Sequence, residues 1–203
     1  MQKLPEPYQS LFEAMLLDSG AEAVPELVRQ GADLSYCDTS TGRTALCAAT
    51  IADRPRAVEA LLQHGANPNQ RFSYRSPSGG SVEADRVALH YAHSVDVAAA
   101  LLKAGAEVDA EDVAGTSPLM RAAFHGHKTV VQALLAAGAA PQARQRKRRG
   151  RTSRTAREFA ESKIAFWRGA ICDKNRETAE KRLRCYEEIR DILLEAESRV
   201  VTT

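Results

Sequence analysis

The chain has 203 residues, with 27% charged, 44% hydrophobic and a formal net charge of +2, a balance typical of a soluble globular domain with a sizeable core. No apolar run approaches the ~20 residues needed to span a bilayer. The first residues lack the pattern of a signal peptide. The four cysteines show no CxxC spacing, which argues against a secreted disulfide framework. We therefore expect a cytoplasmic protein without membrane contact.

One short phrase recurs along the chain. It reads ELVRQGADLS at 26–35, ALLQHGANPN at 60–69, ALLKAGAEVD at 100–109 and ALLAAGAAPQ at 133–142. Its glycines are separated by 34, 40 and 33 residues, a period typical of stacked supersecondary units. The leucines mark the buried face of a helix, and the glycine that follows can adopt a positive φ and cap the C-terminus.

A second, shorter helical stretch precedes three of these phrases. It reads TALCAATIA at 44–52, VALHYAH at 87–93 and SPLMRAAFHGH at 117–127. A Thr or Ser before the stretch offers an N-cap, and Pro118 suits the first helical position. Small alanines allow neighbouring helices to approach closely. Each unit is therefore predicted to run as turn, short helix, tight link, longer helix and glycine.

These units resemble the ankyrin-repeat family. Its T-P-L-H-x-A signature occurs imperfectly at 44–47, 87–90 and 117–120, and GADLS, GANPN and GAEVD match its closing phrase. The unit AGTSPLMRAAFHGHKTVVQALLAAGA matches almost position for position. The resemblance implies an all-α ankyrin-repeat solenoid of about four to five helix-turn-helix units, with turn or hairpin fingers and a helical C-terminal cap.

The resemblance also implies one domain over residues 1–198, followed by a tail at 199–203. Its parts are an N-terminal capping repeat at 10–36, repeat 2 at 37–70, repeat 3 with an inserted finger loop at 71–110, repeat 4 at 111–143, and a basic finger with the C-terminal cap at 144–198.

Repeat 3 departs from the pattern. The link between its helices is three residues short, and Val87 replaces the capping Thr, which should cost about 1 kcal/mol of helix stability. About nine residues are inserted in the turn before it. The insertion is either a tolerated surface loop, because lengthening a loop costs little entropy, or a binding finger. As a finger it would present aromatic and Arg anchors: Arg71, Phe72, Tyr74 and Arg75.

The segment 144–157 carries eight basic residues and no acidic one. Three interpretations stay open: a solvated loop, an electrostatic grip on an acidic protein, or a phosphate-binding surface for nucleic acid. The grip would have its tip at Arg146, Lys147, Arg148 and Arg149. RKRR would serve as a nuclear import signal only in a eukaryotic cell.

Two helices are predicted after the basic segment. Thr155 is the expected N-cap of the first, over 154–162, and Phe159 is its core residue. The second, over 177–198, is amphipathic, and a short coiled coil is an alternative interpretation of it. Its apolar stripe consists of Leu183, Tyr186, Ile189 and Leu193.

The sequence contains none of the motifs that carry enzymatic chemistry. There is no G-x-S-x-G, Walker A or G-x-G-x-x-G motif. His125 and His127 lack accompanying Cys or carboxylate residues at metal-ligand spacing, and His90 occupies a position where the family uses a structural histidine. We therefore expect no catalytic residue, cofactor, metal or small-molecule substrate.

The family's variable positions supply the candidate partner-binding residues, with Phe124 as the strongest. They are Thr39, Ser40, Arg43, Ile51 and Ala52 in repeat 2, Arg86 and His93 in repeat 3, and Val113, Ala114, Thr116, Phe124 and His125 in repeat 4. The finger residues named above join this set.

The leading hypothesis is a non-enzymatic binder, monomeric when free, that holds another protein on its concave face and finger loops. It would act as a stoichiometric inhibitor or adaptor, for example as an immunity protein that neutralises a toxin enzyme. The partner would carry an acidic patch if the basic segment takes part. The alternatives are a host-directed effector that binds host proteins and a nucleic-acid-binding protein that uses 144–157.

Overall fold

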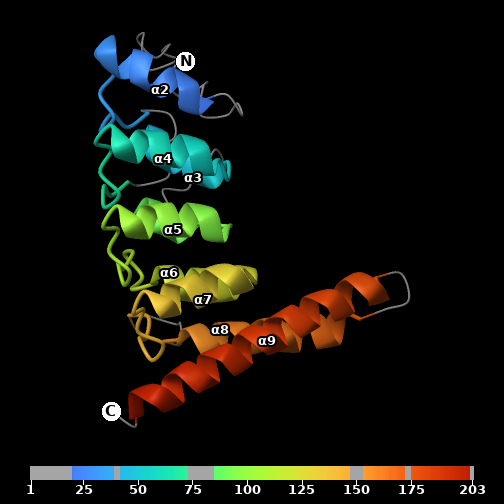
Figure 1. The fold of residues 1–203 in the computed structure, drawn as a ribbon. Coiled ribbons are helices and arrows are strands. Elements are labelled where there is room, and N and C mark those ends of the chain that lie inside the picture. Colours follow the sequence, from blue (N-terminus) through green and yellow to red (C-terminus); the bar gives the residue numbers. More distant parts are fainter. Residues whose placement is uncertain (1–19, 39–41, 73–84, 147–152, 172–174, 202–203) are drawn as a thin grey trace.

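The computed structural model describes residues 20–38, 42–72, 85–146, 153–171 and 175–201 (Figure 1). All the regular elements in these ranges are helical. They are α2 (Gly20–Arg29), α3 (Ala45–Ile51), α4 (Pro55–Gln63), the 3₁₀ helix η1 (Ala88–Tyr91), α5 (Val95–Lys103), α6 (Pro118–His125), α7 (Lys128–Ala136), α8 (Ala156–Ala170) and α9 (Arg176–Val201). In the same ranges, the β-type pairing amounts to an isolated bridge between Phe72 and Arg86. The predicted all-α class is confirmed.

The helices form two layers. The outer layer runs α2, α4, α5, α7 and α9, and the inner layer runs α3, η1, α6 and α8, with each helix packed on its neighbour in the layer (Figure 1). The core lies between the layers and continues through the stack. This is the solenoid that the repeated phrases predict, since each unit buries its apolar face only against adjacent units.

The glycine after each outer helix caps it as predicted. Gly31, Gly65, Gly105 and Gly138 all have φ between 86° and 93°, a backbone conformation that side chains disfavour. The leucines ahead of them, such as Leu61, Leu101 and Leu134, are fully buried. Each repeated phrase therefore encodes both the buried stripe of an outer helix and its end.

The inner helices begin at the predicted caps. The hydroxyl of Thr44 accepts a hydrogen bond from the Cys47 N–H, and that of Ser117 accepts one from the Met120 N–H. Pro118 occupies the first turn of α6. Ala49 and Ala123 are fully buried, so the layers pack closely at these positions.

The inner helix of repeat 3 is shorter than expected. The sequence predicts a helix over 87–93, but only the four residues of η1 are helical and their geometry is 3₁₀. Val87 has no side-chain oxygen that could cap the first turn, and the shortened link leaves the chain extended at Ala92. A helix without a cap and without room for a second turn tightens into a 3₁₀ segment.

The C-terminal helices are longer than those of the stack. The predicted stripe on α9 is confirmed at Tyr186, Ile189 and Leu193, which are buried, and Leu183 is partly buried against the core. At the junction with the stack, the Tyr186 hydroxyl donates to the Phe124 carbonyl at 3.0 Å.

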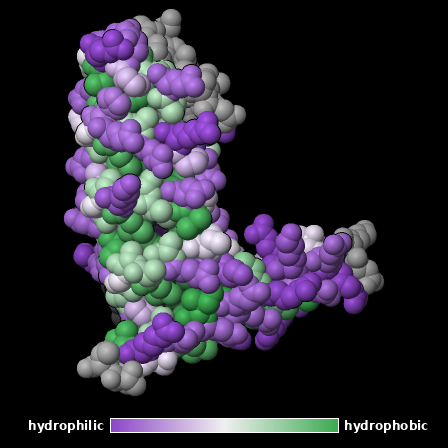
Figure 2. Space-filling model, viewed as in Figure 1, coloured by the Kyte–Doolittle hydropathy of each residue, from purple (hydrophilic) through white to green (hydrophobic). Residues whose placement is uncertain are grey.

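α8 and α9 continue beyond the edge of the stack as a two-helix arm, and the molecule is L-shaped (Figure 1). Figure 2 shows that apolar side chains extend along the stack, whereas the arm is mostly hydrophilic on the face in view. No helix in the described ranges is both long and apolar enough to cross a membrane.

Candidate functional site

The finger of repeat 3 is closed at its base by Phe72 and Arg86. Their backbones exchange hydrogen bonds of 2.9 and 3.0 Å, and the Phe72 side chain is only 4% exposed, with its ring beside Tyr91. The Arg86 guanidinium donates to the Asp112 carboxylate and to the Tyr91 hydroxyl. Phe72 and Arg86 therefore stabilise the finger. Phe72 is buried and Arg86 is partly exposed, and their role as partner contacts stays a prediction.

Asp112 organises the next finger. Its carboxylate accepts hydrogen bonds from the Ala114 and Thr116 N–H groups. Burial opposes ionisation, but these bonds and Arg86 together lower the pKa of Asp112. Thr116 is also buried, and its hydroxyl accepts from Gln145 at 2.6 Å. Thr116 is thus a structural residue as well, whereas Val113 and Ala114 are partly exposed.

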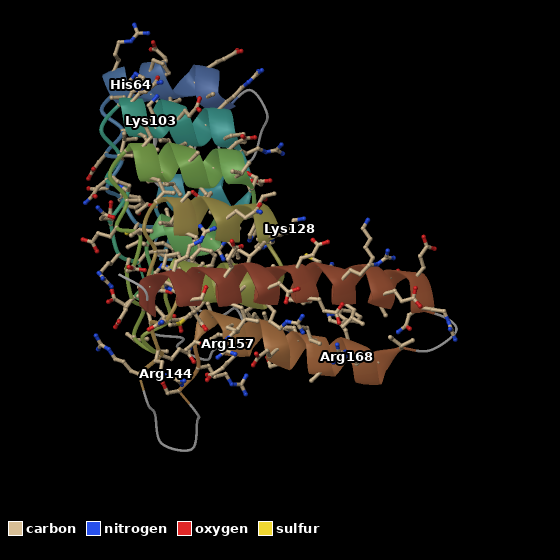
Figure 3. All side chains as sticks on the ribbon, turned by 60° about the horizontal axis from the view of Figure 1, so that its bottom comes forward. His64, Lys103, Lys128, Arg144, Arg157 and Arg168 are labelled. Carbon is tan, nitrogen blue, oxygen red and sulfur yellow. The ribbon has the colours of Figure 1, made fainter. Side chains whose placement is uncertain are left out.

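The described part of the basic segment is tied to the stack. The Arg146 N–H donates to the Ala114 carbonyl, and its guanidinium pairs with Glu111 at 3.1 Å. Arg144 pairs with Glu158 at 2.9 Å, and Figure 3 places it beside Arg157 at the end of the stack. Arg146 therefore lies at the base of the finger and not at its tip as predicted. Lys147, Arg148 and Arg149 lie outside the described residues.

Two further candidates that the structure describes precede the inner helices of their repeats in the sequence. Arg71 is exposed and pairs with Asp85 at 2.9 Å. Arg43 is partly exposed near the start of α3. Thr39, Ser40, Tyr74 and Arg75 lie outside the described residues.

The remaining candidates gather at the C-terminal ends of the inner helices. Ile51 and Ala52 end α3, His93 follows η1, and Phe124 and His125 end α6. Because each repeat places its short helix in the same position, these ends align along one edge of the stack. His93 and His125 are exposed, and Ile51, Ala52 and Phe124 are partly buried.

The rings at this edge form a continuous series. The His93 and His127 centroids are 4.9 Å apart, and His127 lies 5.9 Å from His125. The Phe124 ring meets His125 edge-on at 5.1 Å and Phe159 of α8 at 5.8 Å. The series therefore connects repeat 3, repeat 4 and the C-terminal cap.

α8 adds two residues that the sequence interpretation missed. The Lys163 Nζ lies 3.9 Å from the Phe124 centroid and 5.9 Å from that of Phe166, which is 61% exposed. Phe159, Lys163 and Phe166 are spaced by four and three residues and so share one face of α8. That spacing is readable in the sequence, but only once the helix is known to continue past residue 162. Together, these side chains form what we call the corner surface: His93, Phe124, His125, His127, Lys163 and Phe166.

The surroundings of His125 and His127 favour the neutral form of these two imidazoles. Desolvation by the surrounding protein atoms, followed by the charges of Arg121, Lys163 and the other two imidazoles, lowers the pKa of His125 to about 4. Burial, His93 and Arg182 lower the pKa of His127, while Asp53 opposes them. No group of three His, Cys, Asp or Glu residues in the described part of the chain is arranged to hold a metal ion.

Comparison with known proteins agrees with this architecture. The family model for an ankyrin repeat matches residues 41–72, and the model for three ankyrin repeats matches residues 78–145. The human neurogenic locus notch homolog protein 4 is 36% identical over 137 residues, which make up 66% of this chain. The Caenorhabditis elegans ankyrin repeat and LEM domain-containing protein 1 homolog is 37% identical over 82 residues, or 37% of this chain. The matched regions span only 6% and 12% of those relatives. Two repeat models in register, on a stack of paired helices with glycine caps, establish that the chain belongs to the ankyrin-repeat family.

Proposed function

We propose that the chain is a non-enzymatic binding module that holds a partner protein on the edge formed by its inner helices. Ankyrin repeats are protein–protein interaction modules. The observation that carries the proposal here is the corner surface, where side chains from two successive repeats and the C-terminal cap present a continuous series of rings. Interfaces draw much of their energy from such aromatic and cationic anchors.

The form of the function that the chain supports best is a stoichiometric inhibitor or adaptor. Every described element belongs either to the stack or to its helical cap, so the proposed action is to cover a surface of the partner or to link it to another protein. An immunity protein that blocks a toxin enzyme is one concrete example. Binding that covers the partner's active site would inhibit the partner, and binding elsewhere on the partner would link it to another protein.

Nucleic-acid binding through 144–157 is less well supported. Salt-dependent affinity for nucleic acid requires cations that are free to neutralise phosphates. The two arginines described at the start of this segment, Arg144 and Arg146, already pair with Glu158 and Glu111. These ion pairs favour partner binding on the inner edge over nucleic-acid binding.

The test is affinity capture from a lysate of the source cells with the purified chain as bait. The test variant is His93→Glu/His125→Glu, which changes two exposed residues of the corner surface. The matched control is Gln63→Glu/Gln132→Glu, which adds the same charge on exposed positions of α4 and α7. Circular dichroism melts check that both variants fold.

We expect the parent chain and the control to retain one protein at stoichiometric yield, and the corner variant to lose it. If the partner is an enzyme, adding the chain to its activity assay separates an inhibitor from an adaptor. Retention of the same protein by all three baits would contradict the placement of the site, and retention of none would contradict the binder proposal.

A further inference from the structure

We propose that the corner surface binds an acidic segment of the partner protein, with partner carboxylates at Lys163 and apolar side chains against Phe124 and Phe166. The inference rests on the proposed function and deepens it, because it names the chemistry of the partner at this site. It follows from a local imbalance of charge, from the exposed rings beside it and from the shape of the surrounding surface.

The cations that face this surface lack carboxylate partners within the described ranges. The Lys163 ammonium contacts only rings there, those of Phe124 and Phe166. The Arg121 guanidinium lies over the Tyr91 ring at 5.0 Å and donates to the His90 carbonyl. Arg182 of α9 adds a third positive charge close to His127. A cation held against a ring keeps its capacity to attract an anion.

Three carboxylates of α8 and α9 are engaged in ion pairs with other cations. Glu188 pairs with Lys128 at 2.8 Å, Glu187 pairs with Arg168 at 2.7 Å, and Glu161 pairs with Arg157 at 3.2 Å. Figure 3 places Lys128 at the edge of the stack that meets the arm, and Arg168 far out on the arm.

Asp53 lies close enough to His127 for its negative charge to raise the pKa of that imidazole, against the other contributions. It accepts a hydrogen bond from the Ser94 hydroxyl at 2.6 Å. Asp112 also acts on Arg121, but its carboxylate is paired with Arg86. Against Lys163, Arg121 and Arg182, the exposed Asp53 therefore leaves the surface positive even when the histidines are neutral. Complementary charge from outside the chain would restore the balance, since matched potentials favour association and suppress wrong partners.

The exposed rings of the corner surface require apolar groups on the partner, in addition to carboxylates. Phe166 is largely exposed and stands edge-on to Trp167, whereas Phe124 is partly covered by Lys163. An exposed Phe on a charged helix is an anchor for an apolar group of a partner. A segment that alternates acidic and apolar residues satisfies both the cations and the rings, which a uniformly charged polymer does not.

The surface also has room for such a segment. The stack and the arm enclose an open angle (Figure 2), and the corner surface lies where the two meet, with His93 and His127 on the stack and Lys163 and Phe166 on α8. An extended peptide bound across this angle would contact both the stack and the arm.

Binding of carboxylates should be linked to protonation of the histidines. His125 faces Arg121 and Lys163, and His127 faces His93, Arg182 and Asp53. A bound anion would raise the pKa of these rings, so the complex would take up protons and tighten as the pH falls from neutral toward 5.5. The partner's own carboxylates stay ionised in that range.

The test uses the full chain and a fluorescein-labelled peptide in which Asp and Glu alternate with Leu. A second peptide replaces Asp and Glu with Asn and Gln, and a single-stranded oligouridylate tests for nucleic acid. Fluorescence anisotropy gives the affinities. NMR signals of the histidine rings locate the site, and emission from Trp167, the single tryptophan of the chain, supplies an independent local signal.

We expect the acidic peptide to bind, to shift the His93, His125 and His127 signals, and to bind more tightly at pH 5.5 than at 7.5. Lys163→Glu should weaken binding by about tenfold or more. The control Lys103→Glu makes the same charge change on α5, away from the arm (Figure 3), and should change binding less than twofold. Lys163→Gln replaces Lys163→Glu if the reversal impairs folding.

Equal binding of the acidic and amide peptides would overturn the inference, as would equal effects of the changes at Lys163 and Lys103. Oligouridylate that binds at least as tightly as the acidic peptide would overturn it in favour of nucleic acid. If a partner is captured by the inner edge but tolerates Lys163→Glu, this inference fails while the proposed function stands.

Discussion

His90 shows how one side chain can hold two repeats together. Its Nε2–H donates to the Thr116 carbonyl at 2.9 Å, and its Nδ1 accepts from the Val87 N–H at 3.4 Å. These bonds require the neutral ring, protonated only on Nε2. Burial dominates the electrostatics and lowers the pKa of His90 to about 4. The sequence predicts a structural role for this residue, but its partner in the next repeat is visible only in the fold.

The depressed pKa of His90 predicts that acid destabilises the fold. An unfolded histidine binds a proton near pH 6.5, whereas the folded ring resists it down to about 4. The unfolded state therefore binds more protons between these values, and stability falls as the pH falls through this window. The loss for this one residue is up to about 3 kcal/mol. Urea unfolding at a series of pH values measures it.

The comparison for His90 is the parent chain. In His90→Gln the loss of unfolding free energy between pH 7 and pH 4.5 should be smaller than in the parent chain, because the variant lacks the buried imidazole. An identical pH dependence in the variant and the parent chain would show that His90 is not the group that titrates.

Gly126 is a second residue whose role depends on the tertiary structure. It ends α6 with φ of 80°, and a Cβ placed there would lie 3.1 Å from the Tyr186 ring. We predict that Gly126→Ala costs the strain of a positive φ, about 1–2 kcal/mol, plus about 1–3 kcal/mol for crowding against α9. Chemical denaturation checks the sum.

Gly138 provides the matched control because its φ is 91° and a Cβ there would meet nothing within 4 Å. Gly138→Ala should cost only the backbone strain. Equal losses for the two variants would mean that Tyr186 moves aside freely and that α9 is not tightly docked at Gly126.

At the scale of single elements, the ends of the helices are decided by local side chains. Thr155 and Glu158 form a reciprocal capping box at the start of α8. The Glu158 carboxylate is also paired with Arg144. Burial of the Glu158 carboxyl opposes its ionisation, but the hydrogen bond from the Thr155 N–H and the charge of Arg144 lower the pKa of Glu158. The Glu158 carboxylate thus stabilises both the start of α8 and the base of the basic finger.

Removal of this cap should destabilise the protein measurably. Thr155→Ala is expected to cost about 1 kcal/mol, because the Glu158 N–H loses its acceptor at a buried helix start. Thr155→Ser keeps the hydroxyl and should lie within a few tenths of a kcal/mol of the parent chain. Thermal and urea unfolding measure both. A serine variant as unstable as the alanine variant would assign the effect to the methyl group instead.

η1 shows where element prediction from the sequence is weakest. The spacing of apolar residues correctly marks a short inner segment, and the missing cap at Val87 is visible in the sequence. Whether the segment stays α-helical depends on the length of the link and on packing between α3 and α6. Because the link is short, the segment forms a 3₁₀ turn instead of an α-helix. Local helix propensity alone does not predict this outcome.

At the scale of the whole molecule, the extensive contacts among the described helices run between neighbouring units. α3 packs on η1, η1 on α6 and α6 on α8, and the outer helices follow the same order. In such a stack, stability is the sum of local repeat terms and interface terms. A repeat of low intrinsic stability should therefore unfold locally more readily than its neighbours.

This arrangement predicts uneven hydrogen exchange. Amides of η1, a four-residue 3₁₀ turn, should be about tenfold or more less protected than those of α6, which has a Ser cap and a full second turn. Exchange measured by mass spectrometry on peptides from the two segments tests it. Equal protection would indicate that the two repeats open together as one cooperative unit.

The sequence by itself determined the repeat period, the glycine ends of the outer helices, the buried stripe of α9 and the family. These features are local, because a capping glycine or a leucine pair has the same meaning in every unit. It also pointed to Phe124, His93 and His125, because the family places them at the ends of the inner helices.

Only the tertiary structure decided which predicted residues are exposed. Phe72 and Thr116 are buried and Arg86 is partly buried against Asp112 and Tyr91, whereas Lys163 and Phe166 join the proposed site because α8 continues beyond the repeat pattern. Exposure, ion pairing and the angle of the arm depend on which distant residues meet, and no window of sequence contains that information. The physical reason is that burial and charge balance are properties of neighbours in space.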